Sequence, residues 1–203
     1  MDAGDAGKIK STIVDKNASK RQTLLMSRSQ KTKEALLGEA RNQFWSRGFS
    51  NVSVRDISNA AGVDVALISR YFGSKLGLFE TTLQDLPLLN TDAIKTADQL
   101  IEQVANLFIA ATRDGNNATA TALILRNASD PEVGQEVREL YKRTWYQSLV
   151  QILGSKAKAT RFSAAVLGMH IVETSLKLDG MPPHQSTEYK RELKAFLQAS
   201  ISD

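Results

Sequence analysis

The sequence contains no cysteine and only two histidines among its 203 residues. The absence of cysteine excludes disulfide bonds and thiolate zinc sites, and it is typical of proteins from a reducing compartment. The two histidines are not spaced as a pair of metal ligands, so we expect no metal and no cofactor. No apolar run approaches the ~20 residues of a membrane span, and the first residues lack the apolar stretch of a secretory signal. We therefore expect a soluble, cytoplasmic protein.

The chain also lacks the motifs of common enzymes. Its serine, histidine and acidic residues form no nucleophile elbow, no phosphate-binding loop and no paired carboxylates, so we expect no catalytic residue. No strand pattern is found, whereas apolar residues recur at helical spacing along most of the chain. The sequence predicts an all-α fold with one small and one medium domain.

Positive charge is concentrated in the first part of the chain. Residues 1–85 contain 13 lysines and arginines against 9 acidic residues, whereas residues 86–203 contain 13 of each. The segment from Lys8 to Lys75 carries 13 basic and 5 acidic residues, a local net charge of +8. Such a segment is typical of a surface that binds a polyanion. A basic surface that is only exposed to solvent would have the same net charge, so charge alone does not distinguish the two.

Residues 52–75 predict two short helices joined by a tight turn. Ser53 and Asp56 are spaced as a capping box, so the first helix is expected to begin at about Ser53. The small residues at 60–62 let two helices approach closely, and the glycine among them accepts the positive φ of the turn. Asp64 is expected to cap the next helix on its buried side.

That next helix is predicted to run to about Phe72, with Val65, Ile68 and Phe72 on its inner stripe. Its outward residues are Ala66, Ser69 and Arg70. Helix, turn and helix in this order are typical of a helix-turn-helix DNA-binding motif, whose second helix enters the major groove. Ser74 then caps a further helix, so that Lys75 lies beside free backbone N–H groups that can hold a phosphate.

Several short motifs within residues 30–86 resemble the DNA-binding domain of the TetR-type transcriptional regulators. In chain order they are Gly48-Phe49, Ser53-Val54-Arg55-Asp56-Ile57-Ser58, Ala61-Gly62-Val63, Tyr71-Phe72 and Gly73-Ser74-Lys75. The resemblance implies a helix-turn-helix domain followed by a helical domain that forms a homodimer and encloses an effector cavity.

The predicted DNA contacts come from both helices of the motif and from the start of the next one. They are Ser53, Val54, Arg55, Val65, Ala66, Leu67, Ser69, Arg70, Tyr71 and Lys75. Ser53, Arg55 and Lys75 are expected to contact phosphates, because they flank the helix that enters the groove. Arg70 can bind either a guanine edge or a phosphate, and Tyr71 can serve either purpose.

The apolar spacing predicts a first helix over 30–47 and a fourth over 74–86, so the DNA-binding domain is expected to span 30–86. Residues 1–29 are predicted to form a flexible basic tail. Its basic residues nearest the first helix are Lys20, Arg21 and Arg28. They either reach the DNA or belong to a mobile solubilising extension.

Residues 87–203 are predicted to form a helical domain for effector binding and dimerisation. Its helices are expected over 94–111, 119–127, 130–154, 157–178 and 186–201, with Asp130-Pro131 starting the third of them. The helix over 157–178 is apolar on more than one side, so it needs its own domain and a second subunit as partners. The residues expected to join this interface from the last helix are Leu193, Phe196, Leu197 and Ile201.

Seven polar or bulky residues within these apolar helices are candidates for the effector cavity that the resemblance implies. They are Phe108, Leu123, Arg126, Trp145, Met169, His170 and Glu173. Apolar stripes at helical spacing more commonly form ordinary core, and His170 is either a ligand anchor or a histidine of the dimer interface.

The sequence thus predicts a ligand-responsive repressor that binds a palindromic operator as a homodimer. Its expected partners are double-stranded DNA, a second copy of the chain and a small apolar effector. Two alternatives are an architectural or cell-division DNA-binding factor of the same fold, and a helical ligand carrier whose DNA-binding motif is vestigial.

Overall fold

The computed structural model describes residues 28–84, 86, 93–111 and 118–202, and within these ranges it contains helices and no strand. The all-α prediction is confirmed. Most of the expected tail, including Lys20 and Arg21, lies outside the described residues. None of the described helices is long and apolar enough to cross a membrane.

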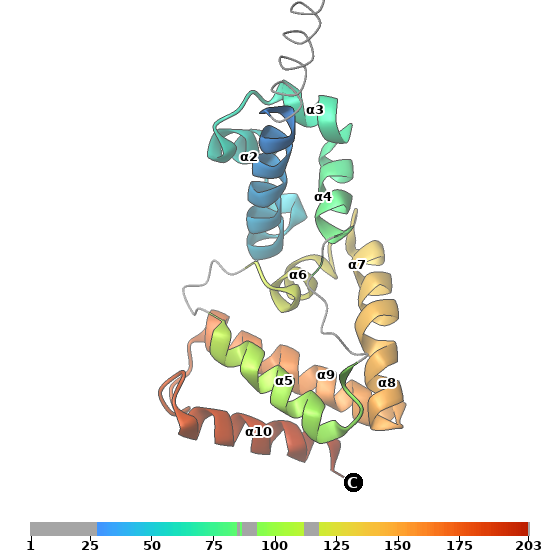
Figure 1. Cartoon of the computed structure of the whole chain (residues 1–203), viewed down its shortest axis with the longest axis vertical. Coiled ribbons are helices and arrows are strands. Elements are labelled where there is room, and N and C mark those ends of the chain that lie inside the picture. Colours follow the sequence, from blue (N-terminus) through green and yellow to red (C-terminus); the bar gives the residue numbers. More distant parts are fainter. Residues whose placement is uncertain (1–27, 85, 87–92, 112–117, 203) are drawn as a thin grey trace, which may run out of the picture.

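The upper part of the molecule is a helical head (Figure 1). It consists of a helix that occupies the described residues 28–47, the 3-10 turn η1 (Phe49–Asn51), α2 (Val54–Ala61), α3 (Ala66–Phe72) and α4 (Lys75–Gln84). α3 lies at the outer end of the head, far from the lower helices. The first helix and α4 stand roughly side by side beneath it and close the head around its core.

Three phenylalanines form the centre of this core. The ring centroids of Phe44, Phe49 and Phe79 lie 5.3 to 5.5 Å apart, and the three side chains are fully buried. Beside them the buried Trp45 Nε1 donates a hydrogen bond of 3.1 Å to Thr82 Oγ1 of α4, which satisfies the indole N–H inside the core. The apolar spacing of the first and fourth helices therefore predicted the core correctly.

The lower part contains six α-helices within the described residues. They are α5 (Ala97–Ala110), α6 (Ala120–Asn127), α7 (Gly134–Tyr141), α8 (Gln147–Leu153), α9 (Lys156–Ile171) and α10 (Thr187–Ile201). The π-helical turn η3 (Lys142–Tyr146) joins α7 to α8, and a second one, η4 (Val172–Leu176), extends α9. α5, α6, α9 and α10 each follow a serine or threonine whose hydroxyl accepts a backbone N–H of the first turn, which explains where they begin.

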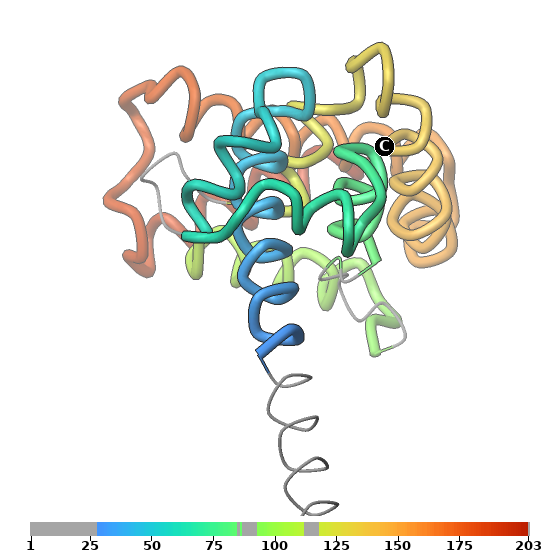
Figure 2. The backbone as a smooth tube through the Cα atoms, turned by 90° about the horizontal axis from the view of Figure 1, so that it is seen from above, coloured from blue at the N-terminus to red at the C-terminus, as the bar shows by residue number. Residues whose placement is uncertain are grey.

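α7 and α8 form one long rod that reaches from the head to the lowest layer, where α5, α9 and α10 pack together (Figure 1). α6 lies between the head and this layer. Seen from above, the rod and the connection between α9 and α10 lie on opposite sides of the molecule (Figure 2). The head therefore rests on α6 and on the upper end of the rod.

The third helix differs from its prediction at the start. Asp64 Oδ1 accepts the N–H of Ala66 at 2.7 Å, as a cap does, but Asp64 is exposed rather than on a buried side. Val65 is 39% exposed, so it is not part of the inner stripe. The reason is that the helix begins only at Ala66, and the preceding residues still belong to the turn.

The helix expected from Asp130-Pro131 begins later, at Gly134. Asp130 Oδ1 accepts the backbone N–H groups of Glu132 and Val133 and so holds residues 131–133 in a turn. The prediction placed the proline in the first helical position, where the structure has a capped turn instead.

The last helix contributes less to a dimer face than predicted. Leu193, Leu197 and Ile201 are buried in the core of their own chain, where they pack with residues of α5 and α9. Buried side chains cannot contact a second subunit, so these three assignments are wrong. Phe196, on the other side of the helix, is 45% exposed.

Candidate nucleic-acid interface and pocket

The turn between α2 and α3 has the geometry that its sequence predicts. The Ser53 hydroxyl accepts the N–H of Asp56 at 3.1 Å, and the Asp56 carboxylate accepts the N–H of Ser53 at 2.9 Å. The Ser53 N–H and the Ser53 hydroxyl both donate to the Asp56 carboxylate and lower its pKa, so the carboxylate stays ionised at the positive end of α2. Gly62 closes α2 with φ 66°, in the left-handed region, and turns the chain toward α3.

α3 is anchored by its inner residues and exposes a small polar face. Ile68 is buried, and Leu67 is half-buried against the core of the head. The exposed residues of the helix are Ala66, Ser69 and Arg70. This face presents one guanidinium, one hydroxyl and one methyl group. At the small residues Ala66 and Ser69 the helix backbone can approach another surface closely.

The start of α4 packs tightly beneath the end of α3. Ser74 Oγ accepts the N–H of Gly77 at 3.0 Å, as predicted for a cap. A Cβ added at Gly77 would overlap the carbonyl oxygen of Phe72, so only glycine allows this approach. The Lys75 ammonium lies 4.1 Å from the centroid of the Phe49 ring, where a cation–π contact holds it near the head surface.

Several predicted contact residues gather around α3, and others lie partly inside the head. Ser53 and Arg55 are exposed at the start of α2. Val54 is half-buried and packs on the core. Tyr71 is half-buried at the end of α3, and its hydroxyl accepts a hydrogen bond of 3.1 Å from Ser29 Oγ of the first helix.

Sequence reasoning did not single out the start of the first helix as part of this surface. Ser29 contacts Tyr71, and the Lys33 ammonium lies 5.7 Å from the centroid of the Phe72 ring. Both residues are more than 30 positions away from α3 in the sequence, and no local motif marks them. Only the packing of the first helix against α3 brings them to this surface.

An unpredicted polar contact joins the head to α6. The Asn127 side chain is completely buried, and its Oδ1 accepts the N–H of Phe49 at 2.7 Å. Its Nδ2 donates to the carbonyl oxygens of Phe44 at 3.1 Å and Leu123 at 3.0 Å. The last residue of α6 is thereby tied to the end of the first helix.

A second contact lies beside it. Asp130 Oδ2 accepts hydrogen bonds from the hydroxyl of Ser50 at 2.6 Å and from its N–H at 3.3 Å. Together with Asn127, this carboxylate fixes the Gly48-Phe49 corner of the head to the connection between α6 and α7. A displacement of α6 therefore acts directly on the head.

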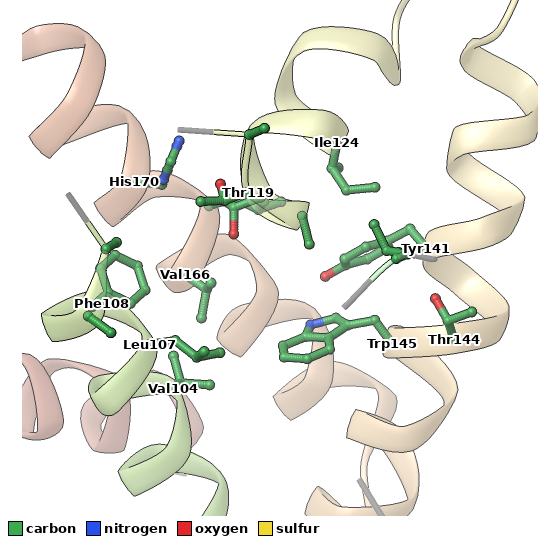
Figure 3. Close-up of a pocket in the computed structure, with 17 residues that line it drawn as sticks. Val104, Leu107, Phe108, Thr119, Ile124, Tyr141, Thr144, Trp145, Val166 and His170 are labelled. Carbon is green, nitrogen blue, oxygen red and sulfur yellow. The ribbon is translucent and has the colours of Figure 1, made fainter. Parts of the chain in front are cut away.

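A cavity of about 380 Å³ lies below the head, between α5, α6, α9 and the rod formed by α7 and α8. Phe108 and His170 line one side, and Tyr141 and Trp145 line the other (Figure 3). Thr144 of η3 completes the wall on the side of the rod. The remaining walls are mainly aliphatic, so the cavity has the composition of a small-molecule site.

Two titratable groups in this cavity are kept uncharged. Burial lowers the pKa of His170, and the positive charge of Arg126 lowers it further, so the imidazole is neutral at pH 7. Burial raises the pKa of the Tyr141 phenol, against the opposing effect of a hydrogen bond with Ser163. The phenol therefore stays protonated and can donate a hydrogen bond.

The structure brings three of the seven candidate effector residues to this cavity, namely Phe108, Trp145 and His170. The other four do not line it. Leu123 is buried in the core shared with the head, and Met169 is buried in the lower core. Arg126 is exposed, and Glu173 accepts a hydrogen bond from the Tyr189 hydroxyl.

Tyr141 and Thr144 line the cavity but were not predicted. Tyr141, Thr144 and Trp145 line the cavity together because residues three and four positions apart lie on the same side of a helix. With Trp145 predicted to line the cavity, this spacing in the sequence indicates the other two. No group of three or more histidine, cysteine or acidic side chains that could hold a metal ion occurs among the residues that the structure describes.

Comparisons with known proteins agree with this architecture. Residues 32–82 match the model of the bacterial regulatory proteins of the tetR family. Over 70 residues the chain is 41% identical to the HTH-type transcriptional regulator BetI of Vibrio vulnificus (strain YJ016). That match covers 34% of this chain and 35% of BetI, so the chain aligns with about a third of the curated relative.

Solved structures extend the similarity over most of the chain. NalD, the secondary repressor of the MexAB-OprM multidrug efflux pump in Pseudomonas aeruginosa, has a TM-score of 0.61 at 18% identity and covers 85% of this chain and 96% of its own. HlyIIR, a hemolysin II transcriptional regulator, has a TM-score of 0.59 at 17% identity and covers 86% of this chain and 99% of its own. The head thus matches the model of the tetR family of bacterial regulatory proteins, and the chain as a whole shares its fold with NalD and HlyIIR.

Proposed function

We propose that this protein is a DNA-binding transcriptional regulator, a ligand-responsive repressor that binds a palindromic operator as a homodimer. The observation that carries the proposal is the exposed polar face of α3 at the outer end of a basic head. A helix that projects in this way fits the major groove, and the surrounding lysines and arginines supply the attraction to phosphates. Such a protein acts on the chromosome in the cytoplasm and needs no catalytic residue.

The DNA contacts divide into two kinds. Ser53, Arg55 and Lys75 lie at the starts of α2 and α4, where they are proposed to bind phosphates and orient the head. Arg70 and Ser69 lie on the exposed face of α3 and are proposed to read base edges. The remaining proposed contacts are Val54, Val65, Ala66, Leu67 and Tyr71.

Exposed apolar side chains support the homodimer. Among the described residues six large apolar side chains are exposed, and four of them lie on or just after α9 and on α10. They are Ile171, Leu176, Leu178 and Phe196. A second copy of the chain that covers this surface would place two heads on one duplex, as a palindromic operator requires.

The contact between α6 and the head supports a response to ligands. α6 lines the cavity with residues of its first half, and its last residue, Asn127, is bonded to the head. A molecule that moves α6 would therefore move the head relative to the dimer axis. Release of DNA requires that this molecule bind the DNA-incompetent arrangement more tightly.

The decisive experiment is selection of bound duplexes from a random pool, because the recovered sequence reports both symmetry and spacing. An approximately palindromic motif is expected. In salt titrations on that motif, Lys75→Ala should flatten the slope of log K against log salt by about 0.9, the value for one phosphate contact. Arg70→Ala should in addition relax the preference at one base pair, by about 1–3 kcal/mol.

The exposed lysine Lys156, at the start of α9 in the lower part, provides the matched control. Lys156→Ala should leave slope and preference unchanged. A motif without symmetry, or binding scattered over the whole chromosome in occupancy maps, would favour the architectural or cell-division factor instead. Failure to bind any duplex at moderate salt would refute the regulator.

A further inference from the structure

The described residues that line the cavity below the head carry no formal charge, since no aspartate, glutamate, lysine or arginine is among them. Arg126 lowers the pKa of His170 electrostatically but does not line the cavity. A ligand in this space therefore meets, among the described lining residues, no side chain that could neutralise an ionic group.

This composition selects against ions by a simple physical argument. An ionised group that leaves water for an apolar cavity loses its hydration, and only a partner of opposite charge or several hydrogen bonds can compensate. Apolar surface, in contrast, gains free energy in proportion to the area removed from water. The wall thus favours neutral molecules over charged ones of the same shape.

The hydroxyls of Thr119, Thr121 and Thr144 belong to the lining, and His170 and Tyr141 add polar groups on opposite sides of it. The neutral imidazole of His170 can donate with one nitrogen and accept with the other, and the Tyr141 hydroxyl points toward the middle of the space (Figure 3). The ring of Phe108 lies on the side of His170, and the indole of Trp145 lies on the side of Tyr141. Aromatic walls of this kind pack well against rings.

We infer that the cavity binds an uncharged, ring-containing apolar molecule with one or two hydrogen-bonding groups that face His170 and Tyr141. This inference rests on the proposed function only for the regulatory consequence of binding. The binding itself depends on the cavity alone and can be measured in the absence of DNA.

Two fluorescent probes with the same ring framework test the selectivity. N-phenyl-1-naphthylamine is neutral, whereas 1-anilinonaphthalene-8-sulfonate adds a single sulfonate. Titrations of the full chain, followed by dye emission, are expected to give a dissociation constant for the neutral probe that is lower by about tenfold or more, because the anion enters without a partner. Equal affinities, tighter binding of the sulfonate or no binding of either probe would overturn the inference.

Three variants locate the binding. Trp145→Ala removes an aromatic wall and is expected to weaken the neutral probe severalfold. Thr144→Lys places an ammonium in the wall and is expected to reverse the preference in favour of the sulfonate. Gln151→Ala changes an exposed residue of α8 that does not line the cavity, so both affinities should stay as in the wild type.

The outcomes separate this inference from the proposed function. Circular dichroism at 222 nm first shows that each variant retains its helices. A protein that binds no duplex but prefers the neutral probe refutes the regulator and supports the inference. A protein that binds a palindromic duplex but prefers the sulfonate supports the regulator and refutes the inference. The same holds if Gln151→Ala weakens the neutral probe as strongly as Trp145→Ala does.

Discussion

The buried amide of Asn127 gives the sharpest test of how the head is held. Asn127→Ala removes three hydrogen bonds at once, two of which reach the head at Phe44 and Phe49. The Phe44 carbonyl oxygen also accepts the N–H of Gly48 at 3.0 Å, so it keeps a partner. The N–H of Phe49 loses its acceptor at 2.7 Å, and the residue is buried away from bulk solvent.

The expected loss of stability follows from these contacts. A buried N–H without a partner costs about 1–3 kcal/mol, and the two lost amide donations add about 1 kcal/mol. A total near 3 kcal/mol corresponds to a fall in the unfolding midpoint of about 6–12 °C for a chain of this size. Asn127→Leu should lose a similar amount, because it fills the space but leaves the Phe49 N–H unpaired.

Thermal unfolding at one fixed protein concentration, followed by circular dichroism, measures this loss. Ser129→Ala is the matched control, because Ser129 is exposed on the same connection and its substitution should leave the midpoint unchanged. Amide hydrogen exchange at Phe49 should also become faster in Asn127→Ala. If Asn127→Ala unfolds at the same temperature as Ser129→Ala, the contact does not hold the head and the proposed route from cavity to head fails.

Three further predictions concern the head, the lower layer and the dimer. Gly77→Ala should lower the temperature midpoint of unfolding, because its Cβ would overlap the Phe72 carbonyl oxygen. Gly38→Ala is the control, because its Cβ meets nothing within 4 Å and alanine should stabilise the first helix by about 1 kcal/mol. Equal midpoints for the two variants would contradict this prediction. Hydrogen bonds from two lysines of α10 lower the pKa of Glu102 from 4.5 to about 2. A pKa that is lower in the folded state stabilises the protein above pH 4.5, and this contribution is lost as the pH falls toward 2. The free energy of unfolding of the wild type, measured by urea titration, should therefore exceed that of Glu102→Gln at pH 4.5 and above, and the difference should shrink as the pH falls toward 2. Leu178→Asp should convert the proposed homodimer to monomer in sedimentation velocity, and an unchanged sedimentation coefficient would remove Leu178 from the proposed interface.

Local signals in the sequence predicted the head well. The capping box of Ser53 and Asp56, the left-handed Gly62 and the cap at Ser74 involve residues within four positions of one another, so a linear pattern contains the whole interaction. The start of α3 was predicted less well. Residues 62–65 form the connection before that helix, and Val65 is exposed there although periodicity alone counted it as an inner residue.

The lower part shows where the sequence becomes insufficient. An apolar stripe identifies a buried face but does not identify its partner, which is why Leu193, Leu197 and Ile201 were assigned to a second subunit although they pack inside the chain. The same ambiguity placed Leu123 and Met169 in an effector cavity, whereas both belong to cores. Phe108, Trp145 and His170 do line the cavity.

The sequence by itself determined the helical class, the helix-turn-helix motif and the concentration of positive charge, because periodicity, caps and charge are properties of neighbouring residues. Only the tertiary structure decided that Asn127 bonds to the head, that Ser29 and Lys33 lie beside α3, and that the described residues lining the cavity are uncharged. These features join residues far apart in the chain. Their contacts are set by how the helices pack against one another, and no local pattern records that packing.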